Sequence, residues 1–143
     1  RGRWFGLTRR VRAVIVNPKL VSPASIRTYG DLASPQLKGK LCLRDRKSVY
    51  NQSLVADQLV SNGAVATSSW IKSMQANLAQ PVFSSDTALT RAVAQGQCGA
   101  ALVNTYYVAR MLSGESGEAD QRLAKNLKLI MPKIKQSNKR KTY

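Results

Sequence analysis

The sequence predicts an α/β fold in which a mainly parallel sheet is flanked by helices. Short apolar runs rich in β-branched residues alternate with segments whose apolar residues recur at helical spacing. Strands that alternate with helices in this way favour parallel pairing. The chain has 143 residues, of which 43% are hydrophobic and only 5 are proline, so it is long enough to bury one core. We therefore expect one domain, or one lobe of a larger protein.

The strands are identified by apolar runs that end at turn-forming residues. The run Val11 to Val16 is β-rich and ends at Asn17-Pro18, where proline cannot donate to a sheet. A second strand is expected over 39–44, a third opens at Cys98, and a last one covers 127–131. Between the first two, Pro and Gly residues indicate short turns or a brief helix.

The helices are identified by apolar stripes and by their end signals. One begins at Tyr50 or Asn51 and stops at Gly63, and the next carries Trp70 and ends before Pro81. A third is capped by Ser84 or Ser85 and stops at residue 96. Two shorter helices follow, one after residue 106 and one ending near 123.

Two adjacent tyrosines, Tyr106 and Tyr107, lie where the third strand turns into a helix. In an open α/β sheet, ligands bind at the carboxyl ends of the strands, because loops and helix N-termini meet there. A bend at that point allows both phenols to face one position, whereas most such pairs only pack at a half-buried surface. Tyr50 lies at a second strand-to-helix corner.

Cys42 and Cys98 are the only cysteines, and the chain has no histidine. Their spacing excludes a CxxC motif, and the lack of histidine argues against a zinc site or a nucleophile paired with a histidine base. The two residues lie in or beside predicted strands, so either a disulfide in an oxidising compartment or two buried thiols fits the sequence.

Four motifs together resemble the bacterial periplasmic ferric-iron-binding proteins that supply ABC importers, and the tyrosine-rich branch of that family in particular. They are Trp-Phe-Gly-Leu-Thr-Arg-Arg at 4–10, Gly-Lys-Leu-Cys-Leu-Arg at 39–44, Val-Tyr-Asn-Gln-Ser-Leu-Val-Ala at 49–56, and Val-Asn-Thr-Tyr-Tyr-Val-Ala-Arg at 103–110. The resemblance extends over roughly residues 1–131 and implies one lobe of a two-lobed periplasmic-binding-protein fold.

The resemblance implies a role for each matching residue. The positions of Tyr50, Tyr106 and Tyr107 match the family's iron ligands, and Asn104 matches an asparagine that supports the site. A synergistic anion, carbonate or phosphate in related proteins, would lie near an arginine and a helix start. In this sequence the matching groups are the Arg9 side chain and the backbone N–H groups of Asn51 and Gln52.

The chemistry of these residue types agrees with ferric iron. Fe³⁺ is a hard cation that prefers anionic oxygen ligands to thiolates, and three phenolates would neutralise its charge. A bound cation can deprotonate tyrosine at neutral pH, so iron binding releases protons and should weaken in acid.

The resemblance also implies how the chain is divided. Residues 1–18 would form a hinge or inter-lobe strand and 19–131 the second lobe, so the first lobe and secretion signal of a periplasmic protein would be absent. The similarity stops at Pro132. The remaining segment, 132–143, is basic and lacks apolar periodicity, so we expect a disordered tail and interpret it as a shifted-frame or gene-end scar.

The alternative function is a basic module that binds nucleic acid or another polyanion. The chain has 23 Lys and Arg against 7 Asp and Glu, a net charge of +16, but much of the excess lies near the two ends. Such a module would show steep salt dependence and indifference to the tyrosines. We expect an iron carrier whose partner is a membrane permease, with no nucleic acid partner and no transmembrane segment. An enzyme is not expected, because no nucleophile-base pair, carboxylate pair or Gly-rich phosphate loop is found.

Overall fold

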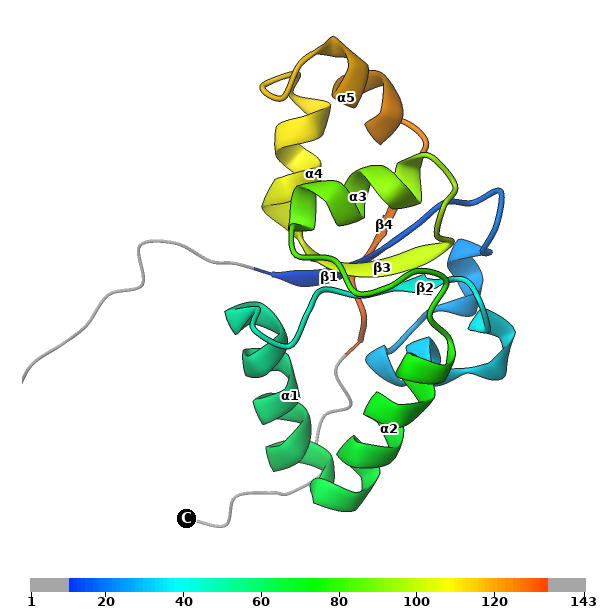
Figure 1. Cartoon of the computed structure of the whole chain (residues 1–143), viewed down its shortest axis with the longest axis vertical. Helices are drawn as coiled ribbons and strands as arrows, with labels where there is room; N and C mark the ends of the chain where they lie inside the picture. The colour runs from blue at the N-terminus through cyan, green and yellow to red at the C-terminus, as the bar shows by residue number, and fades with distance from the viewer. Residues whose placement is uncertain (1–10, 134–143) are drawn as a thin grey trace, which may run out of the picture.

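A four-stranded sheet forms the middle layer of the computed structural model, which describes residues 11–133 (Figure 1). The strands are β1 (Arg12–Val16), β2 (Leu41–Cys42), β3 (Ala100–Asn104) and β4 (Lys128–Ile130), in the spatial order β2-β3-β1-β4. Strand β1 therefore lies inside the sheet, and the assignment of residues 1–18 to a hinge or inter-lobe strand stays a prediction. No helix in the described part is long and apolar enough to cross a membrane.

The strand directions differ in part from the expected pattern. Strands β2 and β3 are parallel, but β1 is antiparallel to both β3 and β4. Three strands thus run in one direction, as a mainly parallel sheet requires, while two of the three pairings are antiparallel. The reason is that β1 pairs with strands far along the chain, and not with β2, the next strand in sequence. The α/β class is confirmed.

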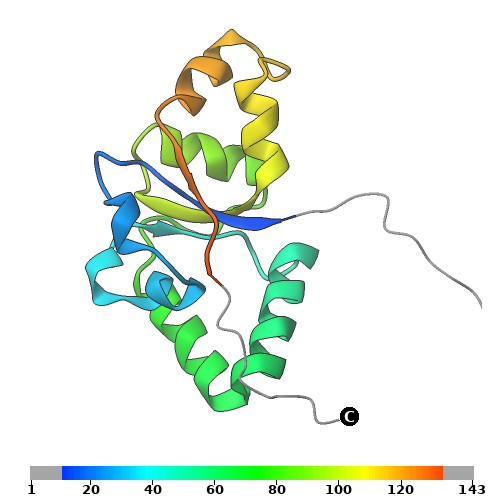
Figure 2. The same ribbon diagram turned by 180° about the vertical axis from the view of Figure 1, so that it is seen from behind.

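Five α-helices cover the two faces of the sheet. They are α1 (Val49–Asn62), α2 (Ala64–Ala76), α3 (Asp86–Ala94), α4 (Thr105–Leu112) and α5 (Glu118–Ala124). Both views place α1 and α2 on one side of the sheet and α3, α4 and α5 on the other (Figures 1 and 2). Three short 3-10 helices, Pro23–Ser25, Tyr29–Ala33 and Pro35–Leu37, occupy the connection where short turns or a brief helix were expected.

The helix boundaries follow the signals in the sequence. Ser85 caps α3, with its side chain accepting from Ala88 N–H at 3.4 Å. Gly63, at φ +84°, ends α1 and allows the sharp turn into α2, because a positive φ is costly for other residues. Helix α2 ends at Ala76, and Leu78 forms a β-bridge with Leu41 beyond it.

The second strand is shorter than expected. Only Leu41 and Cys42 pair with β3, whereas the prediction covered 39–44. Arg44 instead forms an isolated bridge with Phe83, in the segment that leads to α3. The chain thus leaves the sheet early and turns towards α1.

The core is divided by the alternation of side chains along β1. Val14 and Val16 face α1 and α2 and pack in one cluster with Leu54 and Met74. Ile15 faces the opposite side and packs with residues of α3 and β3. All four residues from Ala13 to Val16 are fully buried.

A disulfide joins Cys42 to Cys98, so of the two alternatives left by the sequence the structure has the bridge. Their Cα atoms lie 5.8 Å apart, and both residues are buried. The bridge ties β2 to the segment that enters β3. A disulfide is typical of an oxidising compartment.

We expect the Cys42→Ala/Cys98→Ala double variant to lower the free energy of unfolding by about 2–4 kcal/mol, because the bridge closes a loop between residues 56 positions apart. Denaturant unfolding monitored by circular dichroism measures this. Wild-type chain under reducing conditions should match the double variant; an unchanged midpoint in both would contradict the prediction.

Gly99 allows a close approach of the chain to the first loop. A Cβ atom added there would lie 2.5 Å from Val21 Cγ2, and the residue's N–H donates to the Lys40 carbonyl at 2.7 Å. We expect Gly99→Ala to cost about 1–3 kcal/mol through overpacking. Gly30→Ala is the control, because its added Cβ would meet nothing closer than 3.4 Å. Thermal unfolding of both variants tests the difference, and equal melting temperatures would contradict it.

Candidate metal site

The two adjacent tyrosines occupy the first turn of a helix that starts where β3 ends. Asn104 is the last residue of β3 and the N-cap residue of α4, so Tyr106 and Tyr107 follow at once. Their ring centroids are 4.2 Å apart, with the planes tilted by 31°. Both side chains are half-buried. The strand-to-helix corner predicted from the sequence is therefore present.

Tyr50 reaches the same place from another element. It lies in the first turn of α1, and its hydroxyl oxygen is 3.1 Å from that of Tyr106. The parallel pairing of β2 and β3 explains this arrangement, since the chain leaves both strands at one edge of the sheet. The structure thus brings together the tyrosines that the sequence singled out.

The environment of Tyr106 favours its neutral form. Burial and a hydrogen bond with the Tyr107 side chain raise the pKa of Tyr106, and the side chains of Tyr50 and Asn104 oppose that rise. A cation that binds here must therefore displace a firmly held proton.

A buried arginine that the sequence analysis did not select lies beside the tyrosines. The guanidinium of Arg12 lies over the Tyr50 ring, with Cζ 6.0 Å from the centroid. It donates to Asn51 Oδ1 and, at 3.4 Å, to Asn104 Oδ1. One feature of the sequence could have identified Arg12: it is a charged residue at the start of a strand that is otherwise fully apolar.

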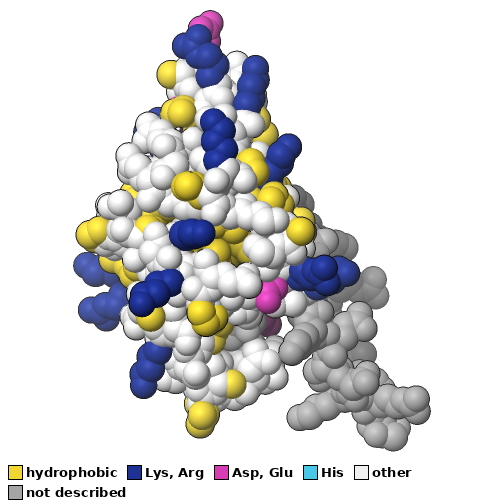
Figure 3. Space-filling view, turned by 90° about the vertical axis from the view of Figure 1, so that its right-hand side faces the viewer, with side chains coloured by type: hydrophobic (Ala, Val, Ile, Leu, Met, Phe, Trp, Pro, Cys, Tyr) yellow, Lys and Arg dark blue, Asp and Glu magenta, His cyan; other side chains and the backbone are white. Residues whose placement is uncertain are grey.

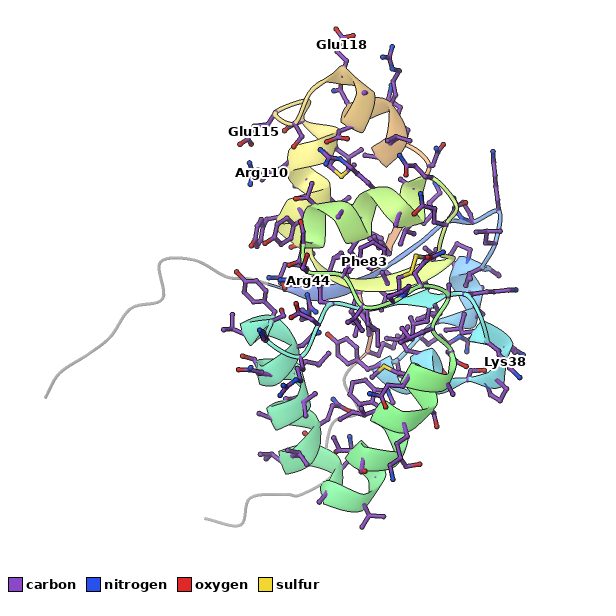
Figure 4. The ribbon with its side chains drawn as sticks, viewed as in Figure 1. Lys38, Arg44, Phe83, Arg110, Glu115 and Glu118 are labelled. Atoms are coloured by element: carbon purple, nitrogen blue, oxygen red, sulfur yellow. A yellow bond between two sulfur atoms is a disulfide. The ribbon has the colours of Figure 1, made fainter. Side chains whose placement is uncertain are left out.

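Arg12 shares a buried carboxylate with a second arginine. The side chain of Asp86 is 2% exposed and accepts from Arg44 Nε at 3.0 Å, while Arg12 Nη1 lies 3.8 Å from its other oxygen. Burial lowers the pKa of Arg12, and the Asp86 charge raises it. Figure 4 shows Arg44 close to Phe83, whose carbonyl oxygen accepts from Arg44 Nη1 at 3.0 Å.

The predicted anion donors differ in their surroundings. Gln52 N–H donates to the Ser48 carbonyl at 3.0 Å as the first bond of α1, and its role as an anion donor stays a prediction. Asn51 N–H precedes that bond in the helix, among the N–H groups without an intrahelical acceptor. The Asn51 side chain is used internally, because its Nδ2 donates to the carbonyl of Arg44. Arg9 lies outside the described residues, as does 134–143 of the predicted tail.

Asn104 is buried next to the tyrosine pair, and its supporting role stays a prediction. It is 1% exposed, accepts from Arg12 through Oδ1, and its side chain hydrogen-bonds Tyr106. The amide donor is thus buried at the base of the tyrosine pair.

Other features of the described chain do not point to a different site. No group of three or more His, Cys, Asp or Glu side chains within 11–133 could hold a metal. A pocket of about 780 Å³ lies between α1 and α2, with lining residues such as Leu54, Trp70 and Met74, but none of the three tyrosines lines it. On the face shown in Figure 3, Lys and Arg side chains are spread from end to end and do not gather in one patch.

Comparison with known proteins gives a consistent result. Iron uptake proteins A1 and A2 of Synechocystis sp. are 38% and 36% identical to this chain over 131 residues, or 92% of it. The Fe(3+)-binding periplasmic protein of Serratia marcescens is 29% identical over 107 residues. No protein-family model matches the chain.

Solved structures of such proteins share the fold. Trichodesmium IdiA (FutA) in complex with iron and citrate ligands superposes with a TM-score of 0.85 at 36% identity, covering 90% of this chain and 40% of that one. Apo FutA2 from Synechocystis PCC6803 gives 0.86 at 34% identity, covering 94% and 42%. The chain spans only 36% and 38% of the two Synechocystis iron uptake proteins.

These matches confirm the resemblance drawn from the motifs and the assignment to one lobe of that fold. The names of the relatives describe iron uptake and iron binding.

We expect the free energy of unfolding to fall above about pH 10, because a raised Tyr106 pKa means that the folded chain holds this proton more tightly than the unfolded chain. Below that range the group does not change stability with pH. Burial also raises the pKa of Tyr29, so Tyr106→Phe should reduce the alkaline loss but not abolish it. Urea unfolding at a series of alkaline pH values measures this; an identical decline in wild type and variant would contradict it.

Proposed function

From the premise that this chain is a homologue of part of the periplasmic ferric-iron-binding proteins, we propose that it binds Fe³⁺ as cargo for an ABC-type importer. The observation that carries the proposal is the meeting of three phenols at one sheet edge, with the Tyr50 and Tyr106 oxygens 3.1 Å apart. Tyr50, Tyr106 and Tyr107 are the proposed ligands.

The environment supports binding coupled to proton release. The hydroxyls of Tyr50 and Tyr106 are hydrogen-bonded to each other, and the raised Tyr106 pKa keeps that phenol neutral until a cation replaces the proton. Three phenolates would balance the charge of Fe³⁺. Binding should then strengthen as pH rises and weaken in acid, which gives a release route.

We place a synergistic anion, carbonate or a similar oxyanion, beside the start of α1. The N–H groups at the start of a helix favour an anion, and Asn51 N–H is one of these groups in α1. Ser48, the N-cap residue, makes no side-chain cap bond, and its hydroxyl is buried with no partner in the described chain. Arg9 remains a proposed anion partner on the resemblance alone.

The proposed setting is the periplasm, with a membrane permease as the partner. The disulfide is compatible with that compartment. The polyanion-binding alternative is not favoured, because the relatives are iron uptake and iron-binding proteins.

Titration of the chain with chelated ferric iron and bicarbonate should produce a visible phenolate-to-iron charge-transfer band. We expect Tyr106→Phe and Tyr107→Phe to lose most of the band, and Tyr50→Phe to weaken it, since each removes one anionic oxygen ligand. Absorbance and competition with a chelator measure the effects.

Tyr29→Phe is the matched control for these variants. The Tyr29 hydroxyl donates to the Arg12 carbonyl at 2.8 Å, so it is engaged with the backbone and is not one of the proposed ligands. Its loss should leave the band in place. A folded wild-type chain without a band, or a band that persists in all three ligand variants, would contradict the proposal.

A further inference from the structure

We propose that Arg12, which forms an ion pair with Asp86, is a positioning residue of the tyrosine site. It orients the side chains of Asn51 and Asn104, and through them the two helix starts that carry the tyrosines. This inference rests on the proposed function for its effect on iron, but the arrangement itself is a property of the metal-free chain. Arg12 is distinct from the predicted anion partner Arg9.

The first step is the place of Arg12 in the sheet. The antiparallel register sets Arg12 directly opposite Asn104, the residue that ends β3 and precedes the tyrosine helix. The Arg12 side chain is 10% exposed, so its guanidinium is enclosed between the sheet edge and the surrounding elements. A buried guanidinium requires partners, and those partners are found in three different elements.

The second step is the reach of the guanidinium. One nitrogen, Nη2, donates to Asn51 in the first turn of α1, and the other, Nη1, donates to Asn104 at the end of β3 at 3.4 Å. The same group lies over the ring of Tyr50. The planar guanidinium of Arg12 therefore connects α1, which carries Tyr50, to the end of β3, which leads into the helix that carries Tyr106.

The third step concerns the direction of the Asn104 amide. Its Oδ1 faces Arg12, so its Nδ2 faces the other way, towards Tyr106, with which the Asn104 side chain interacts. A phenolate oxygen formed on Tyr106 is an acceptor that such a donor can serve. Arg12 thus sets which end of the amide faces the tyrosines.

The fourth step is the ion pair between Arg12 and Asp86. Asp86 is the first residue of α3, and its buried carboxylate interacts with both Arg12 and Arg44. The Arg12–Asp86 contact is an ion pair at 3.8 Å and not a hydrogen bond, because Asp86 Oδ1 has no hydrogen-bond partner in the described chain. It places the guanidinium beside the start of α3. Arg44 in turn donates to the Phe83 carbonyl, which joins the network to the loop before α3.

The test compares Arg12→Gln and Arg12→Lys with a matched control, Arg91→Lys. Arg91 also pairs with a buried aspartate, Asp120, at 2.8 and 2.6 Å, but it connects α3 to α5 and touches no proposed ligand. Lysine keeps the positive charge beside Asp86 but lacks the planar guanidinium with its two donor nitrogens, so Arg12→Lys separates the effect of positioning from that of charge. It also replaces Arg12→Gln as the test if that variant fails to fold.

With iron, we expect both Arg12 variants to bind about tenfold or more weakly in competition with a chelator, the usual effect of losing a partner that orients a metal ligand. At saturating iron their charge-transfer band should also shift, whereas a merely structural role would leave the band of the folded fraction unchanged. Arg91→Lys should keep both the affinity and the band. A folded Arg12→Lys variant with wild-type affinity and band would overturn the inference.

A metal-free measurement keeps this inference separate from the proposed function. In ¹H–¹⁵N spectra, the side-chain amide signals of Asn51 and Asn104 should move in both Arg12 variants and stay in place in Arg91→Lys. Unmoved signals would overturn the inference whatever the iron result. A wild-type chain without an iron band would instead refute the proposed function, and the amide signals would still decide whether Arg12 holds the two asparagines.

Discussion

The antiparallel pairing of β1 with β3 is the constraint on which the rest of the structure depends. It inserts a fully buried strand into the middle of the sheet, so that Val14 and Ile15 face opposite helical layers and each layer has its own core. The same register brings Arg12 to the edge where β3 ends. A slip of one residue would exchange the two faces and move the guanidinium away from Asn104. Core packing and site geometry therefore have a common origin.

Features set by neighbouring residues could be predicted from the sequence. The corner after β3, the stop at Gly63 and the Ser85 cap all depend on local chemistry, and each is found where the sequence indicated. The proximity of Tyr50 to Tyr106 could also be predicted from the sequence, because it requires only that β2 and β3 be parallel neighbours. The family resemblance strengthened that expectation, since its motifs include all three tyrosines.

The direction of β1 could not be predicted in the same way, because it is decided by a partner almost ninety residues further along the chain. A parallel β1 would have brought Asn17 to the tyrosine edge in place of Arg12. Asn17 instead lies at the opposite end, where its Nδ2 donates to the Val93 carbonyl at 3.0 Å. The helical bond of Gln52 could not be predicted for a related reason: the exact first bond of α1 determines which N–H groups are engaged.

The loop that the disulfide closes contains only part of the tyrosine site. Its closed loop runs from Cys42 to Cys98 and contains Tyr50, whereas Tyr106 lies beyond it. If a protease cut the turn at Gly63 between α1 and α2, the two pieces would stay covalently joined, with β2 still attached to the approach to β3. The bridge would thus keep the two parts of the proposed tyrosine site covalently joined after a backbone nick, so that neither part could diffuse away.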